Sequence, residues 1–139
     1  MSICLFCQAL LLLISLAAFA TAAIGLRCAA PVIASTQSVR DLLAVATARG
    51  YANAPVVQLH TVERSAEFYA ANRIMYGSDG EPVKFEGAGQ VIEAARKSGG
   101  PVLCLVPVEF EAQLTTLQVA TSEIIADNGR VALVRVSVK

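Results

Sequence analysis

The chain has 139 residues, which is enough for one domain of ordinary size. Eleven Lys and Arg residues balance eleven Asp and Glu residues, so no nucleic acid is expected as a partner, because phosphate binding needs a concentrated cationic surface. Hydrophobic residues make up 55% of the chain, which argues against a disordered protein. The first charged residue is Arg27, so an uncharged segment, residues 1–26, precedes a part that carries every charge.

The uncharged segment predicts a transmembrane helix. Residues 3–26 form an apolar run that would be roughly 36 Å long as a helix, and a bilayer core is about 30 Å thick. A cleaved signal peptide is the alternative, because residues 20–22 (Ala-Thr-Ala) have the small side chains of a cleavage site. Signal peptides carry Lys or Arg before the apolar run, and this chain has none there. A retained helix is therefore the preferred interpretation, with the lipid bilayer as a partner.

The four cysteines indicate neither a metal centre nor a redox pair. Cys4 and Cys7 have C-x-x-C spacing, but they lie in the apolar run, where hydrocarbon surroundings disfavour a thiolate. Cys28 lies at the expected membrane edge, and Cys104 lies in an apolar run where it resembles a small hydrophobic side chain. With a single His and no zinc-like spacing, neither a metal site nor a cofactor is predicted.

Residues 27–37 form the expected connector between the membrane helix and a soluble domain of residues 38–139. Pro31 is expected to end the membrane helix, because proline has no backbone N–H to donate. Ser38 has the position of an N-cap for an amphipathic helix that Gly50 closes. The expected elements are helices at 39–49, 61–72, 90–97 and 109–117, and strands at 55–60, 73–76, 82–85, 102–106, 123–126 and 131–138.

This alternation of strands and helices predicts a small three-layer α/β domain with a mixed sheet. Residues 102–106 are the most apolar run and are expected to form a central strand. Residues 127–129 (Asp-Asn-Gly) favour a tight turn, which predicts a C-terminal β-hairpin. In the second predicted helix, Phe68 and Tyr69 are expected to face the sheet.

His60 is the first candidate for chemistry. It ends a predicted strand, the position at which α/β folds often place ligands. Glu63 and Glu67 are one helical turn apart and could converge with it, but a surface or capping role for His60 is the preferred interpretation. Gly87 and Gly89 imitate the start of a dinucleotide-binding loop, but the third glycine is missing, so a turn that opens a helix is preferred.

No catalytic residue is predicted. Ser65 and Cys104 are candidate nucleophiles, and a small hydrolase that uses His60 with either of them is one hypothesis. Neither nucleophile has a base and an orienting group at a readable spacing. Glu109 and Glu111 point to different sides of a predicted helix and do not form an acid–base pair.

Residues 57–73 (VQLHTVERSAEFYAANR) resemble a pattern in bacterial membrane glycosyltransferases of the aminoarabinose-transferase-like and protein-mannosyltransferase-like type, which have the GT-C fold. In that pattern a strand precedes a helix with an Arg-Ser…Phe-Tyr…Arg signature, and a short strand follows. The layout of terminal hydrophobic helix, connector and α/β domain agrees as well, so the resemblance covers residues 1–138. The matching positions are Arg64, Ser65, Phe68, Tyr69 and Arg73, and His60 ends the strand before them.

The resemblance implies an enzyme that moves a sugar from a polyprenyl-phosphate carrier to a lipid or protein acceptor. Known members use acidic residues in the first extracytoplasmic loop, sometimes with a divalent metal. This chain has no such loop, so no catalytic residue carries over. The resemblance therefore implies a carboxy-terminal fragment, inactive alone, whose domain covers the membrane active site or helps to admit the acceptor. The missing transmembrane part would be its partner, and the six positions above have a structural or acceptor-side role.

The side of the membrane receives two opposite predictions. Arg27 alone would place the domain in the cytoplasm by the positive-inside rule. The resemblance places it on the extracytoplasmic side of the inner (cytoplasmic) membrane, and it is preferred because other helices set the orientation of a polytopic protein. A stand-alone membrane-anchored or secreted α/β binding module of the cell envelope is the alternative function.

Overall fold

The computed structural model describes the backbone of residues 2–138, together with the side chains outside residues 2–7, 9 and 31–37. The side chains of Cys4 and Cys7 therefore lie outside the described residues. The chain divides into two compact units, Met1–Ala34 and Ser35–Lys139.

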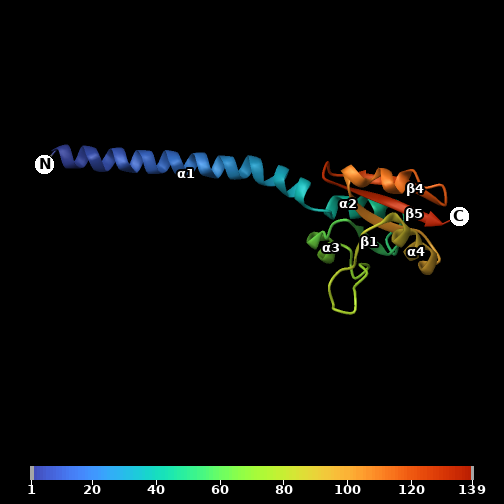
Figure 1. Ribbon diagram of the computed structural model, residues 1–139. Coiled ribbons are helices and arrows are strands. Elements are labelled where there is room, and N and C mark those ends of the chain that lie inside the picture. Colours follow the sequence, from blue (N-terminus) through green and yellow to red (C-terminus); the bar gives the residue numbers. More distant parts are fainter. Residues whose placement is uncertain (1, 139) are drawn as a thin grey trace. The chain divides into compact units, whose positions relative to one another are not determined.

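The first unit is formed by one long helix, α1 (Ser2–Gln37), which is drawn as a single continuous helix in Figure 1. Its segment Leu10–Ala30 is long and apolar enough to cross a membrane. The prediction that Pro31 ends the helix is wrong, because α1 continues through it to Gln37. A proline removes one backbone hydrogen bond and bends a helix, but the other bonds of the adjoining turns remain.

The second unit is built on a five-stranded sheet. Its strands in chain order are β1 (Val56–Leu59), β2 (Lys84–Phe85), β3 (Val102–Pro107), β4 (Ala120–Asp127) and β5 (Val131–Val138). In space the order is β2-β1-β3-β5-β4. The pairs β2–β1 and β1–β3 are parallel, whereas β3–β5 and β5–β4 are antiparallel. The predicted mixed sheet with a C-terminal hairpin is confirmed.

Strand β3 lies in the middle of the sheet, as its apolar sequence predicts. Residues 102–106 are all buried, and Cys104 lies between Val57 of β1 and Val134 of β5. Strand β4 forms one edge, and its register shifts by a bulge between Ile124 and Ala126.

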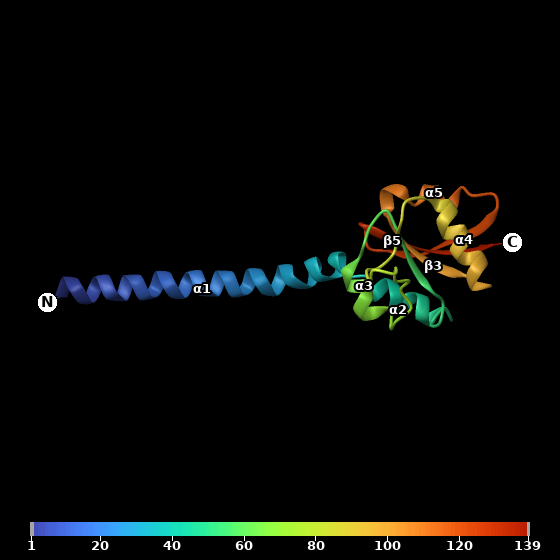
Figure 2. The ribbon, with the colours of Figure 1, turned by 60° about the horizontal axis from the view of Figure 1, so that its bottom comes forward.

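Helices cover both faces of the sheet, which confirms the three layers. Helices α2 (Arg40–Ala48) and α3 (Arg64–Tyr69) cover one face. Helix α4 (Ala88–Ser98) covers the other face with the short turns η1 (Val108–Phe110) and α5 (Ala112–Thr115), so the helix predicted at 109–117 is two separate pieces. Figure 2 shows the two groups on opposite sides of β3 and β5.

Helix α3 is shorter than predicted and has a different inner face. Its small residues Ala66 and Ala70 are fully buried against the sheet. Phe68 and Tyr69 are 84% and 46% exposed, so the prediction that they face the sheet is wrong. Alanines allow a short helix to approach the sheet closely, and the large aromatic rings then lie on its outer side.

Two turns set the ends of neighbouring elements. Gly99 ends α4 with a φ of +66°, a left-handed conformation that glycine adopts without a steric penalty. Asn128 and Gly129 form the turn between β4 and β5, as the sequence predicts, and Gly129 has a φ of +81°. The segment 73–76, predicted as a strand, makes only isolated bridges: Ile74 pairs with Val56 of β1, and Tyr76 pairs with Pro82, which lies outside the strands.

Candidate functional site

Several polar side chains lie at the edge of the sheet that is formed by the carboxyl ends of its parallel strands. Strands β2, β1 and β3 all end at this edge, and the antiparallel strand β5 begins there. Ligands of open α/β sheets commonly bind beyond the carboxyl ends of such strands. We call this edge the strand-end site, and it consists of His60, Glu63, Glu86, Gln113 and Arg130.

His60 follows β1 directly and has an unusual backbone. Its φ is +60°, and its N–H donates to the carbonyl oxygen of Phe85 at 2.8 Å. Histidine is one of the few residues that tolerate this left-handed conformation. The conformation turns the chain away from the sheet, so that the half-buried ring stacks obliquely on Phe110 with centroids 4.7 Å apart.

The two ring nitrogens of His60 face different partners. Nε2 lies 2.9 Å from Oε1 of Gln113, so a protonated Nε2 donates a hydrogen bond to this amide oxygen. Nδ1 lies 3.8 Å from a carboxylate oxygen of Glu86. Glu86 also pairs with Lys84 at 2.7 Å, and the hydrogen bond from Lys84 is the main reason that the pKa of Glu86 is lowered. The ring is thus held between an amide and a carboxylate.

Glu63 and Arg130 form the second half of the site. The two nitrogens of the Arg130 guanidinium donate to the two carboxylate oxygens of Glu63 at 2.8 and 2.7 Å. The Glu63 side chain is 7% exposed, whereas Arg130 is 43% exposed. The hydrogen bonds from Arg130 to Glu63 raise the pKa of Arg130. Glu63 follows β1 and Arg130 directly precedes β5, so this bidentate pair joins the end of β1 to the start of β5.

Gln58 supports this pair from inside the sheet. Its side chain is fully buried, and its Oε1 accepts a hydrogen bond from the backbone N–H of Glu63. Its Nε2 has no hydrogen-bond partner among the described residues. A buried amide with one unpaired end is rare and costly, so Gln58 leaves a hydrogen-bond donor available beneath Glu63.

The second unit begins at the same edge. Asn128, in the turn before β5, donates from Nδ2 to the carbonyl oxygen of Ser38 at 3.2 Å. The next residue, Val39, donates its N–H to Oγ of Ser65 at 3.3 Å. The first residues after α1 are therefore fixed beside the strand-end site, within the same compact unit.

The five positions that predict a glycosyltransferase pattern divide into two groups. Ser65 and Arg73 contact the scaffold: Ser65 accepts from Val39, and Arg73 donates to the carbonyl oxygens of Ala70 and Tyr51 at 2.7 and 3.0 Å, while burial lowers its pKa. Arg64, Phe68 and Tyr69 are exposed, and Arg64 pairs with Glu67 and Glu81 at 3.1 and 3.0 Å.

Three residues of the strand-end site, Glu86, Gln113 and Arg130, are not predicted by the sequence. Glu63 and Glu67, the carboxylates considered as possible partners of His60, pair with Arg130 and Arg64 respectively. The partners of His60 are Glu86 and Gln113 instead. Glu86 directly follows a strand, so the strand-end rule applied to every strand would have found it. No sequence signal marks Gln113 or Arg130, since strand order decides their place.

The candidate nucleophiles are engaged elsewhere. Cys104 is fully buried in the central strand, and burial raises the pKa of its thiol well above the usual range. The Ser65 hydroxyl accepts the hydrogen bond from Val39 described above. Gly87 precedes α4 as its N-cap with an extended backbone, as expected for a turn that opens a helix. The described residues contain no group of three His, Cys, Asp or Glu side chains that would hold a metal ion.

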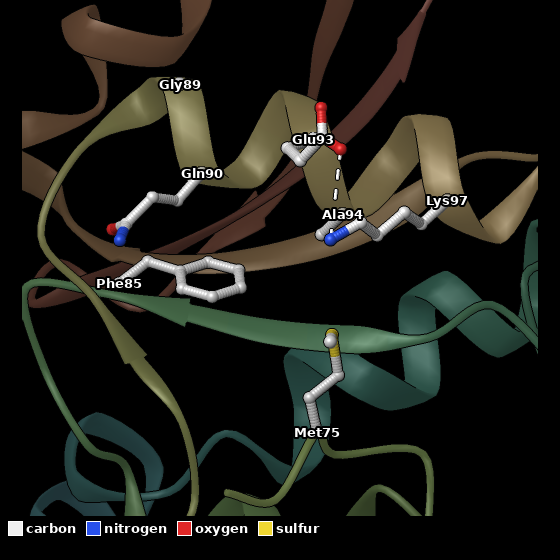
Figure 3. A pocket seen from close by; sticks show the side chains of 7 residues that line it. All are labelled: Met75, Phe85, Gly89, Gln90, Glu93, Ala94 and Lys97. Carbon is white, nitrogen blue, oxygen red and sulfur yellow. Dashed lines mark ion pairs between the residues drawn. The ribbon is translucent and has the colours of Figure 1, made fainter.

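A hollow of about 340 Å³ adjoins the site on the outer side of β2. Figure 3 shows Met75 and Phe85 on one side and α4 on the other, with the ion pair of Glu93 and Lys97 at the rim. Gln90 borders this hollow, and its Oε1 accepts from the backbone N–H of Glu86. The hollow is mostly apolar, in contrast to the polar strand-end site beside it.

Comparison with protein-family models, with curated proteins and with solved structures finds no match to this chain.

Proposed function

We propose that this chain is a membrane-anchored accessory domain of a bacterial glycosyltransferase that moves a sugar from a polyprenyl-phosphate donor to a lipid or protein acceptor. The domain lies on the extracytoplasmic side of the inner membrane and makes no bond itself. One observation carries the proposal: the strand-end site and the start of the soluble unit share one edge, through the hydrogen bond from Asn128 to Ser38. A substrate presented from the bilayer is then close to the polar side chains.

The composition of the site supports a role in holding the acceptor. Carboxylates, an amide, an imidazole and a guanidinium offer both donors and acceptors, which suit the hydroxyl groups of a sugar or a polar lipid head. The ring of Phe110 beside His60 adds an apolar surface next to these polar groups. Such a mixture of a few polar groups and an aromatic face is typical of small-molecule sites.

The burial and contacts of the candidate nucleophiles support an accessory role for the domain rather than hydrolase activity. A thiol that is buried and has a raised pKa is a poor nucleophile, which applies to Cys104. His60 contacts Gln113 and Glu86, while the Ser65 hydroxyl contacts the backbone of Val39. A base and a nucleophile within hydrogen-bond reach would be needed for hydrolysis.

A stand-alone binding module of the cell envelope is the second candidate. It is favoured by the compactness of the unit Ser35–Lys139, which has a hydrophobic core on each face of its sheet. The coding DNA upstream of Met1 separates the two candidates. About ten further apolar segments and an early acidic pair are expected for the glycosyltransferase, since a bundle of such helices is needed to bind a lipid carrier.

A sugar-transfer assay on membranes tests the proposal. The chain is expressed together with the coding sequence upstream of it, and transfer from a labelled polyprenyl-phosphate sugar is measured. Gln113→Ala and Glu86→Ala are expected to lower transfer by about tenfold each, because a lost polar contact to a bound ligand costs about 1.5 kcal/mol. Arg96→Ala on α4, which breaks only an exposed pair with Glu93, is the matched control. Unchanged transfer in both site variants would contradict the proposal.

A further inference from the structure

Helix α3 presents two aromatic side chains to its surroundings. Phe68 is 84% exposed and Tyr69 is 46% exposed, while Ala66 and Ala70 on the inner side are fully buried. Tyr69 also borders a shallow groove that is lined by Arg40 and other residues of α2. Two adjacent exposed aromatic rings form a surface that water solvates poorly, and such surfaces mark contacts with a partner or with lipid.

This aromatic pair lies on the side of α3 that adjoins the beginning of the soluble unit. Residues three and four apart share one side of a helix, so Phe68 and Tyr69 lie on the same side as Ser65. Ser65 accepts the hydrogen bond from the N–H of Val39 at 3.3 Å. Phe68 and Tyr69 therefore lie on the side of α3 that faces Val39, two residues after the end of α1.

Chain length then limits how far α3 lies from a bilayer. The apolar segment of α1 ends at Ala30, and the helix continues for seven residues to Gln37. Seven helical residues span about 10 Å, and Val39 follows two residues later. The headgroup layer itself extends about 5–8 Å beyond the hydrocarbon on each side. The connection thus sets an upper limit on how far Val39, and with it α3, can lie from the headgroups of a membrane that this segment crosses.

We propose that Phe68 and Tyr69 insert into the lipid headgroup layer of that membrane and turn the strand-end site toward its surface. The proposal rests on the membrane anchoring in the proposed function. Aromatic rings favour this layer because the ring is apolar while a phenolic hydroxyl still reaches water or phosphate. The membrane anchor alone limits the distance between the domain and the bilayer, and the aromatic contact adds a preferred orientation of the domain.

A single tryptophan tests the contact, since the chain contains none. The full chain carrying Phe68→Trp is reconstituted in vesicles of three parts phosphatidylethanolamine and one part phosphatidylglycerol, with and without brominated acyl chains. The matched control is Val119→Trp, which is 60% exposed and directly precedes β4, at the end of that strand opposite Asn128. Both positions are exposed, and circular dichroism checks that both variants keep the fold.

Bromine is expected to quench the F68W emission at least about twofold more than the V119W emission, because interfacial aromatic rings lie near the acyl chains. Equal quenching of the two variants would overturn the contact. Alkaline washing of the same vesicles separates this failure from failure of the anchor. A chain that is retained but unquenched refutes the contact alone, whereas a chain that is washed away refutes the anchoring and the contact together. The sugar-transfer assay remains an independent measure of the proposed function.

Discussion

The Cys104 thiol shows how position in the fold decides the chemistry of one residue. It lies at the centre of β3, fully buried, and burial raises the pKa of the thiol. The same residue type at Cys28 lies exposed on α1. Sequence alone interprets Cys104 correctly as a small hydrophobic side chain, because the apolar residues around it exclude water.

A dependence of stability on alkaline pH follows from this burial. The unfolded thiol ionises above about pH 8.5 while the folded thiol stays protonated, so stability is complete below that pH and falls as the pH rises. The free energy of unfolding should decline by up to about 1.4 kcal/mol per pH unit from this group. Urea unfolding of the detergent-solubilised chain, followed by circular dichroism, measures the decline.

The Cys104→Ala variant should lose this part of the alkaline decline, whereas Cys28→Ala should keep it. Tyrosine and lysine residues titrate in the same range, so the difference between each variant and the original chain is the relevant quantity. A decline that is identical in Cys104→Ala and in the original chain would contradict the burial of the thiol.

The strand-end site was only partly predictable from the sequence. His60 was found because it ends an apolar strand, and strand ends are where α/β proteins bind ligands. Its partners Glu86 and Gln113 lie far along the chain, and only the order β2-β1-β3 brings them to the same edge. Local spacing offers only Glu63 and Glu67 as candidate partners, because helical periodicity relates residues that are close in sequence and not residues on different strands.

At the level of elements, helix α3 differs most from its prediction. Ala66 and Ala70 contact the sheet, while Phe68 lies outside. The hydrophobicity of Phe and Tyr had favoured the opposite orientation. Two alanines leave room for close packing, and Ser65 and Arg73 fix the rotation of the helix through hydrogen bonds to Val39 and Tyr51.

This orientation predicts opposite effects of two substitutions. Ala66→Leu should lower the free energy of unfolding by about 1–3 kcal/mol, because extra methyl groups do not fit a filled core. Phe68→Ser should change it by no more than about 0.5 kcal/mol, since the side chain is exposed. Urea unfolding measures both. A large loss in Phe68→Ser with none in Ala66→Leu would restore the original prediction.

The other elements follow the sequence closely where the pattern is strong. Strands β1, β3 and β5 and helices α2 and α4 begin and end within a few residues of their predicted bounds. A prediction that depends on a single residue is less reliable: Pro31 predicts the end of a helix, but α1 continues to Gln37. The segment 109–117 predicts one helix but divides at Glu111; Leu114 is its buried residue, while Phe110 and Leu117 pack against the same core and stay partly exposed.

At the scale of the whole molecule, the apolar helix α1 and the folded unit have different physical roles. The segment Leu10–Ala30 is uncharged except for Arg27, and none of its most apolar window is buried within the protein. An apolar helix of this length whose side chains are not buried in the protein is more stable in a bilayer than in water. The folded unit completes its own core around the sheet.

Arginines placed in the apolar helix should release the chain from membranes. Each Arg near a helix centre costs about 2.5–3.5 kcal/mol on insertion, so the double substitution Leu16→Arg and Phe19→Arg should shift most of the protein to the soluble fraction after alkaline washing. Val119→Arg, at an exposed position of the folded unit, should leave it with the membranes. Mass spectrometry of the membrane fraction also checks that residues 1–26 are retained. A chain that lacks them would support the signal-peptide alternative.

The bulge in β4 has a consequence for how neighbouring copies behave. An open strand at the edge of a sheet leaves a row of backbone N–H and C=O groups unpaired, and such a row favours self-association. The outer edge of β4 is such a strand, but its register shift between Ile124 and Ala126 breaks the regular row of unpaired backbone groups. An irregular edge is a poor template for a second strand, so the bulge disfavours edge-to-edge pairing between copies of this chain.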